Sequence, residues 1–301
     1  MGQSHHPVLG APDVKILFLR SLLAPVLAVI LAAPLHATEP DLSVVVSILP
    51  LQTMVEAIGG DHVTTMVMVP PGAPPSVFEM SPKQTAALQD ASLYVAMGIP
   101  HERNWMPQVQ AARPDLPVVR MFDHVKVRTI TGTDPRGGKE MPDPHIWTGP
   151  AQLRDMAMAI RDALSAVAPD RAAEFATNTE TWLSRLDAVD AEAREKLAPH
   201  AGKAFLVFHP AFGYLADAYG LRQIAIEERG MEPGPQTIAN AIDAARAENI
   251  RVIFVQAQLS TEEARTVAAE IGGEVATLDV LAPDPIETIA TVADAFVAAF
   301  K

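Results

Sequence analysis

Short runs of β-branched and apolar residues recur along the chain from residue 42, and stretches with helical spacing separate them. Such runs are short and apolar enough to be strands buried on both faces of a parallel sheet. In the first half they predict strands at 43–51, 63–70, 93–98 and 118–122. The intervening stretches, such as 81–91 and 102–113, predict crossover helices. The pattern therefore predicts a first α/β lobe.

The second half of the chain repeats this plan. Four further runs predict strands at 204–209, 222–227, 251–256 and 274–281. Helical stretches fill the gaps, and a last helix is expected from about Pro285. Alternating strands and helices favour parallel sheets, so the sequence predicts an α/β protein with two four-stranded lobes.

One long helical stretch separates the two halves. No glycine or proline interrupts residues 170–198, and apolar side chains recur there at roughly helical spacing. Asp170 is a suitable N-cap residue. At 1.5 Å per residue the helix is about 45 Å long, so we expect a stiff connection between the lobes. The expected division is 38–150 for the first lobe, 151–200 for the connecting helices and 201–301 for the second lobe.

The N-terminus has the features of a secretory signal. Lys15 and Arg20 precede an unbroken apolar run from Leu22 to Leu35, and small residues follow it. The run is shorter than the roughly 20 residues that a membrane-spanning helix needs, which favours cleavage over anchoring. We expect residues 1–37 to be a signal peptide with an N-terminal extension, cleaved near Ala37/Thr38, and the mature protein to be periplasmic.

Composition restricts the partners further. The 301 residues include no cysteine, so neither a disulfide nor a lipid-modified cysteine can form. The formal net charge is −13, and removal of residues 1–37, which contain Lys15, Arg20 and Asp13, changes it to −14. An acidic protein of this kind is a poor partner for nucleic acid or anionic membranes.

Metal-binding side chains occur at the predicted carboxyl ends of the strands, where ligands bind in open parallel sheets. His209 ends one strand, Asp279 lies near the end of another, and His145 stands in the proline-rich segment 142–150. Two imidazoles and one carboxylate can bind zinc together with a fourth group or a water. By position alone, His145 and His209 are equally well explained as hydrogen-bonded core histidines.

Other residues are secondary candidates. Ser76 and Glu79 lie in the loop after the second predicted strand, and His101 follows the third. Exposed surface positions are the default expectation for His62 and His124. No short zinc motif, paired cysteines or glycine-rich phosphate loop occurs in the sequence, so motif rules alone give a weak signal.

Six segments resemble, in order along the chain, the signature segments of the zinc- and manganese-binding solute-binding proteins of ABC importers. They are VPPGAPPSVFEMSP, DPHIWTGP, FHPAFGYLADAYGL, EERGMEPGP, FVQAQLS and TLDVL. The resemblance implies two (β/α)4 lobes joined by a long rigid helix, with one metal between them. It also implies that His145, His209 and Asp279 are metal ligands.

The chain departs from this family at the first ligand. Ser76 stands where the family usually has a histidine, and a serine hydroxyl is a poor zinc ligand. Water, Glu79 or His101 could take its place. Imidazole ligands suit zinc better than manganese, so Zn²⁺ is the expected ion and Mn²⁺ the alternative.

Three functions compete on this basis. The first is a receptor that delivers zinc to the membrane permease of an ABC importer, without enzyme activity; it is expected to be a monomer, with a periplasmic metallochaperone as a further candidate partner. The second is a zinc hydrolase, with Glu79 or Glu227 as general base. The third is a binding protein of the same fold for another small solute.

Overall fold

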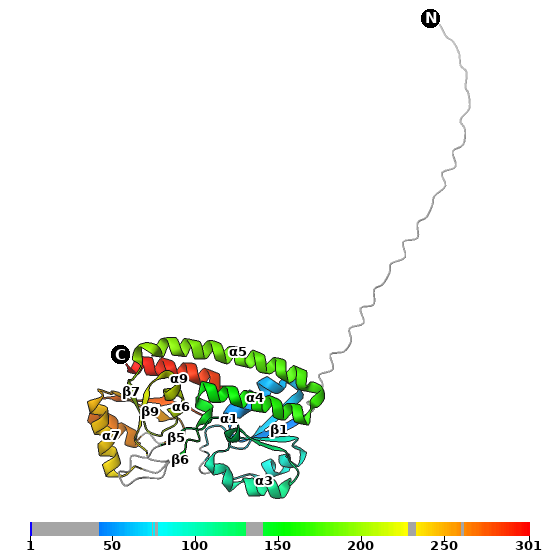
Figure 1. Cartoon of the computed structure of the whole chain (residues 1–301), viewed down its shortest axis with the longest axis horizontal. Coiled ribbons are helices and arrows are strands. Elements are labelled where there is room, and N and C mark those ends of the chain that lie inside the picture. Colours follow the sequence, from blue (N-terminus) through cyan, green and yellow to red (C-terminus); the bar gives the residue numbers. More distant parts are fainter. Residues whose placement is uncertain (2–41, 74, 76–77, 131–140, 228–232, 260–261) are drawn as a thin grey trace. The chain divides into compact units, whose positions relative to one another are not determined.

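The computed structural model describes Met1 and residues 42–73, 75, 78–130, 141–227, 233–259 and 262–301. The expected signal peptide therefore lies outside the described residues, apart from Met1. Residues 42 onward form two parallel four-stranded sheets with helices around them (Figure 1). This confirms the predicted α/β architecture with two lobes.

The first sheet has the strand order β2-β1-β3-β4, with every neighbouring pair parallel. Its strands are β1 Leu42–Val46, β2 Val63–Val67, β3 Leu93–Ala96 and β4 Val118–Arg120. The central strands β1 and β3 are almost fully buried, whereas the edge strand β4 is largely exposed. The expectation that all strands are buried on both faces therefore holds for the centre of the sheet and is wrong at its edge.

The second sheet has the order β10-β9-β7-β8 and is also parallel. Its strands are β7 Ala204–Val207, β8 Arg222–Ala225, β9 Val252–Gln256 and β10 Glu274–Leu278. In each sheet the strand order reverses at the two central strands, β1 with β3 and β7 with β9. The crevice beyond the carboxyl ends at such a point is where α/β proteins place ligands.

Nine α-helices are assigned in the described residues. Their bounds are α1 Leu49–Gly59, α2 Pro82–Ala87, α3 Met106–Ala112, α4 Pro150–Val167, α5 Ala172–Leu197, α6 Gly213–Tyr219, α7 Pro235–Ala247, α8 Glu262–Ile271 and α9 Pro285–Ala299. A two-stranded antiparallel pair, β5 Thr129–Ile130 and β6 Met141–Pro142, lies between the sheets in sequence. Within this part of the chain, no helix has the length and hydropathy required to cross a membrane.

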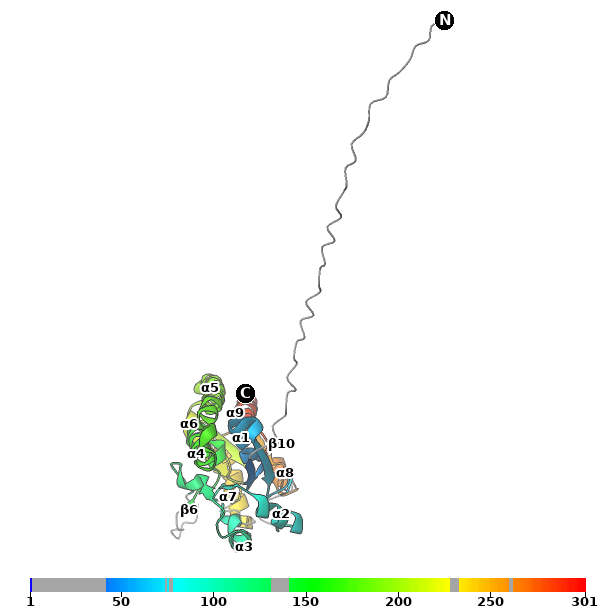
Figure 2. The same cartoon turned by 90° about the vertical axis from the view of Figure 1, so that its right-hand side faces the viewer.

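The predicted long helix is α5, which runs alongside α4 and α9 (Figures 1 and 2). It buries Phe175, Trp182 and Leu186 on one face, and each such side chain contributes roughly 1.5–3 kcal/mol of hydrophobic stabilisation. The predicted N-cap at Asp170 is wrong. Residues Pro169–Arg171 form a separate 3-10 turn, and α5 begins only after Arg171.

One hydrophobic core connects both halves of the molecule. It contains residues of β1, β3, α4, α5 and α9 together with Phe205 and Phe254 from the second sheet. Phe296 of α9 packs its ring against both of these phenylalanines, with centroids 4.1 and 5.0 Å away. A second cluster lies between the second sheet and helices α7 and α8. The shared core holds the two sheets to the same long helices.

Candidate metal centre

His209 lies just beyond the carboxyl end of β7, the strand at the centre of the second sheet. The backbone N–H of Phe208 still donates to the carbonyl of Phe254 in β9, at 2.8 Å, so the chain stays in the sheet up to the residue before His209. Pro210 then turns the chain toward α6. The His209 side chain is 21% exposed, so it is partly accessible to solvent.

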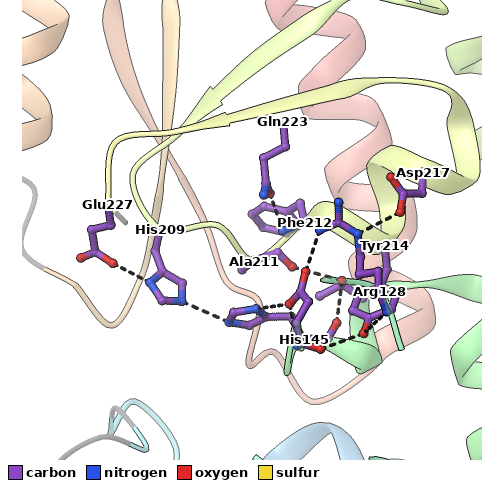
Figure 3. Close-up of polar contacts among 11 residues, drawn as sticks. Arg128, His145, His209, Ala211, Phe212, Tyr214, Asp217, Gln223 and Glu227 are labelled. Carbon is purple, nitrogen blue, oxygen red and sulfur yellow. Dashed lines mark hydrogen bonds and ion pairs between the residues drawn. The ribbon is translucent and has the colours of Figure 1, made fainter. Parts of the chain in front are cut away.

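Glu227 lies beside His209 because β8 is the neighbour of β7. The ladder continues past both strands, since the N–H of Glu227 donates to the carbonyl of Phe208 at 2.8 Å. The Nδ1 atom of His209 then lies 2.6 Å from Oε2 of Glu227 (Figure 3). A carboxylate can only accept a hydrogen bond, so Nδ1 of His209 carries the hydrogen.

His145 is oriented by Asp143 in the same manner. Oδ1 of Asp143 accepts hydrogen bonds from both the backbone N–H of His145, at 3.0 Å, and its Nδ1, at 2.8 Å. This two-residue turn precedes a 3-10 turn at Ile146–Thr148 and the start of α4 at Pro150. The Asp143 side chain is fully buried, so its position is fixed by its hydrogen bonds.

Arg128 and Tyr214 also form hydrogen bonds with Asp143. Nη1 of Arg128 lies 2.8 Å from Oδ2 of Asp143, and its Nε donates to Asp217 at 2.9 Å. The Tyr214 hydroxyl donates to the backbone carbonyl of Asp143 at 2.7 Å. Every oxygen of Asp143 is thus hydrogen-bonded, which offsets the cost of burying its charge.

Further hydrogen bonds join the His145 segment to the second lobe. The indole N–H of Trp147 donates to the carbonyl of Val280 at 2.7 Å. The Thr148 hydroxyl reaches the carbonyls of both His145 and Ala211. The segment that carries His145 is therefore bound to the loops that follow β7 and β10.

These contacts bring the two histidines together. Their Nε2 atoms lie 3.1 Å apart, and the rings meet nearly at right angles, at 81°. Since both Nδ1 atoms donate to carboxylates, the lone pair of a neutral ring is at its Nε2 atom. Two lone pairs repel at this distance unless a proton or a cation lies between them. The nitrogen atoms of two imidazoles bound to one tetrahedral zinc lie about 3.3 Å apart, which is close to the observed distance between the two Nε2 atoms.

The electrostatics keep His145 neutral. Burial lowers its pKa below the ordinary value of 6.5, and the nearby His209 and Arg128 act in the same direction against the opposing effect of Asp143. Burial would raise the pKa of Asp143, but the hydrogen bonds from His145 and Arg128 outweigh this and hold it below its usual range. A neutral imidazole backed by an ionised carboxylate is the form in which histidine binds metals.

Asp279, the third residue implied by the family resemblance, is exposed. Its Oδ1 accepts hydrogen bonds from Gln258 Nε2 at 2.6 Å and from the N–H of Leu281 at 2.9 Å. It also lines a cavity of about 210 Å³ at the start of α9. Among the described residues, no group of three His, Cys, Asp or Glu side chains is arranged to hold a metal ion. Joint ligation by His145, His209 and Asp279 therefore stays a prediction.

The secondary candidates lie on the first lobe. Ser76 is outside the described residues, and Glu79 is an exposed loop residue. His101 is exposed on a 3-10 turn, Pro100–Asn104, that follows β3. Burial lowers the pKa of His101, and the charges of Arg103 and His209 lower it further.

The turn that carries His101 is anchored by its neighbour Glu102. The buried Glu102 carboxylate accepts hydrogen bonds from Ser47 Oγ and from the N–H groups of Met97, at 2.8 Å, and Gly98, at 2.9 Å. Burial raises the pKa of Glu102, and these hydrogen bonds partly offset the effect. His101 is therefore presented by a fixed turn at the carboxyl end of β3.

Two of the remaining histidines were assigned to the surface by the sequence analysis. His124 is exposed, as expected. The expectation for His62 is wrong, because its side chain is buried and its Nε2 lies 2.9 Å from Glu174 of α5. The pairing depends on the contact between α1 and α5, which no local pattern reveals.

Sequence reasoning missed the residues that orient the two histidines. Glu227 was considered only as a general base in the alternative of a zinc hydrolase, and Arg128 and Tyr214 were not considered. Of these residues, only Asp143 could have been identified from the local sequence, because it lies two residues before His145. Glu227 could have been assigned to His209 only with the strand order of the second sheet in hand.

Comparisons with known proteins agree with this architecture. The family model described as zinc-uptake complex component A, periplasmic (ZnuA) matches residues 44–299. A crystal structure of ZnuA superposes with a TM-score of 0.79 at 32% identity, covering 87% of this chain and all of that one. A ZnuA deletion mutant with zinc bound gives 0.80 at 33% identity, covering 86% of this chain and 98% of that one.

Curated relatives are more distant in sequence. The zinc-binding lipoprotein AdcA of Streptococcus pneumoniae is 29% identical over 290 residues, covering 89% of this chain and 55% of that protein. The chain thus spans about half the length of the AdcA proteins it matches. A putative metal-binding protein of Treponema pallidum is 28% identical, with 82% of each chain covered. Since the family model covers nearly all of the described part, this chain belongs to the ZnuA family of periplasmic zinc-uptake components.

Proposed function

We propose that this chain is a periplasmic binding protein that captures zinc between His145 and His209 and delivers it to the membrane permease of an ABC importer. The observation that carries the proposal is the 3.1 Å separation of the two Nε2 atoms, with both Nδ1 atoms bonded to carboxylates. This arrangement leaves the two Nε2 atoms as donors for a metal ion, at nearly the spacing of two imidazole nitrogens on one zinc.

Asp279 is the proposed third ligand. The indole of Trp147 binds the carbonyl of Val280, so the residue after Asp279 is tied to the segment that carries His145. To bind the metal, the Asp279 side chain would have to change its rotamer and give up its hydrogen bond with Gln258. The remaining position would be filled by water, Glu79 or His101, because Ser76 offers a weak ligand.

Zinc is the proposed cargo, with manganese as the alternative. Both donors that the structure brings together are imidazoles, and nitrogen ligands favour zinc over manganese. The names of two relatives support this choice: AdcA is described as zinc-binding, and one ZnuA structure contains zinc.

A hydrolase function is disfavoured by the position of Glu227. Its carboxylate binds Nδ1 of His209, on the opposite side of the ring from the Nε2 atom that would face the metal. It is therefore placed to orient the histidine and not to activate a metal-bound water. We propose that the protein binds and releases its cargo without catalysis.

The proposed location and partners follow from the family and from the sequence. A cleaved signal near Ala37/Thr38 would deliver the mature protein to the periplasm, where a permease is its partner and a metallochaperone could load it. We propose a monomer with a first lobe at 38–150, connecting helices at 151–200 and a second lobe at 201–301. The hydrophobic core shared by both sheets supports a fixed arrangement of these lobes.

The test is a metal titration of the protein purified from the periplasm without a histidine tag and stripped of metal. The proposal predicts one tight zinc per chain, weaker manganese binding, and loss of zinc binding in His209→Ala. His124→Ala, which removes an exposed histidine, is the matched control and should bind as the wild type does. No zinc binding by the wild type, or full binding by His209→Ala, would reject the proposal.

A further inference from the structure

Glu227 is held beside His209 by the sheet as well as by its own side chain. The N–H groups of Ile226 and Glu227 donate to the carbonyls of Val207 and Phe208, at 2.9 and 2.8 Å, beyond the assigned ends of β8 and β7. The Glu227 side chain is 12% exposed, and its Oε2 lies 2.6 Å from Nδ1 of His209. Its position is thus a consequence of strand pairing.

The carboxylates behind the two histidines have different neighbours. Asp143 is paired with His145 and with Arg128, and Arg128 is shared with the exposed Asp217. In the part of the chain that the structure describes, His209 is the one basic side chain that pairs with Glu227. The Glu227 carboxylate lies one imidazole ring away from the proposed cargo.

We propose that Glu227 is a positioning and specificity-determining residue for the cargo: it fixes Nε2 of His209 toward the ion and strengthens that nitrogen as a donor for zinc over manganese. The inference rests on the proposed function. A carboxylate behind a histidine raises the basicity of the metal-facing nitrogen. The gain is larger for zinc than for manganese, because zinc forms the stronger bonds with nitrogen ligands.

Two variants separate the contributions of Glu227. Glu227→Gln keeps an acceptor for the Nδ1 hydrogen and removes the charge, whereas Glu227→Ala removes both. We expect the zinc dissociation constant to rise about 10- to 100-fold in Glu227→Ala and by a smaller factor in Glu227→Gln. The manganese dissociation constant should rise less, so the ratio of the manganese to the zinc dissociation constant becomes smaller.

The control is Glu248→Gln, which removes an exposed carboxylate of the same lobe that pairs with Arg222. It should leave both dissociation constants unchanged. Cobalt(II) substituted for zinc provides a spectroscopic readout, because its visible absorption reports the ligand field. We expect both Glu227 variants to shift that spectrum and the control variant to leave it unchanged.

The experiment uses the full chain, and it begins with the wild type. If the wild type binds neither zinc nor manganese, the proposed function fails, and the inference fails with it. If the wild type binds zinc and both Glu227 variants bind it equally well, only the inference is overturned. It is also overturned if zinc and manganese weaken by the same factor while the cobalt spectrum stays unchanged, since that result indicates a structural role. If Glu227→Ala fails to fold, the dissociation constants and the cobalt spectrum of Glu227→Gln decide whether the inference holds.

Discussion

Gly213, the first residue of α6, lies directly against the guanidinium group of Arg128. A Cβ atom at Gly213 would overlap that group and would come within 2.9 Å of Oδ2 of Asp143. Arg128 could move aside only by giving up its bonds to Asp143 and Asp217. The absence of a side chain at residue 213 is therefore what allows Arg128 to reach the carboxylate behind His145.

We expect Gly213→Ala to weaken zinc binding about 10-fold, because displacement of Arg128 disturbs the carboxylate that orients His145. Overpacking should also cost about 1–3 kcal/mol, which exceeds the gain of up to about 1 kcal/mol in helix propensity. Zinc titration and urea unfolding measure the two effects. Gly234→Ala is the control, since among the described residues no atom beyond its chain neighbours lies within 4 Å of the added Cβ, and it should leave the zinc affinity unchanged. Equal zinc affinities for Gly213→Ala and Gly234→Ala would contradict this role of Gly213.

Arg128→Leu should lower the free energy of unfolding by about 2–3 kcal/mol. Leaving a buried charge without its partner costs roughly 3–5 kcal/mol, and the partial exposure of Arg128 reduces this cost because solvent screens the pair. The measurement is chemical denaturation of the metal-free protein. Arg154→Leu breaks an exposed ion pair with Asp187 and should change the stability by no more than about 1 kcal/mol. A loss in Arg128→Leu no larger than in Arg154→Leu would mean that the Asp143 charge is satisfied without Arg128.

Much of the fold could be predicted from the sequence because buried parallel strands consist of continuous apolar runs. The ends of these runs were less predictable. The first predicted strand extended to residue 51, yet β1 ends at Val46 and Pro50 lies in the first turn of α1. Proline fits a helix start and not the interior of a sheet, so it marked the true boundary. The predicted helix at 102–113 is likewise divided into a 3-10 turn and the shorter α3.

The site was predictable to the extent that it depends on strand ends. His209 was predicted to end the strand 204–209; β7 ends at Val207, and His209 lies just beyond it. Its pairing with Glu227 could not be predicted, since it needs both the order of β7 and β8 and their register. The close approach of Arg128 to Gly213 joins residues 85 positions apart, and nothing in the local pattern of either residue signals it.

The pH dependence of the metal-free protein should reveal His145. Its pKa lies below the ordinary value of 6.5 in the folded state, where it faces Asp143, His209 and Arg128. The unfolded chain therefore takes up a proton on this residue first. The contribution of His145 to the free energy of unfolding should be constant above about pH 6.5. It should fall as the pH drops toward the pKa of His145 in the folded state, by up to about 1.4 kcal/mol per pH unit.

Urea unfolding of the metal-free protein between pH 5 and 8 tests this expectation. His145→Gln should reduce the slope below pH 6.5, and His124→Gln, at an exposed histidine, should leave it unchanged. If His145→Gln keeps the full wild-type slope, protonation of His145 does not limit the stability of the fold in acid.

Zinc itself should stabilise the folded protein, because an ion held by His145 and His209 binds the native state and not the unfolded chain. At a free zinc concentration 100 times the dissociation constant, linkage adds about 2.7 kcal/mol. For a chain of this size that corresponds to a rise of roughly 5–10 °C in Tm. Thermal unfolding with and without zinc measures the rise, and a chelator should reverse it. His145→Ala and His209→Ala should each abolish the shift, whereas His124→Ala should keep it. A shift of equal size in all four proteins would show that zinc binds elsewhere, and the 3.1 Å histidine pair would then need a different explanation.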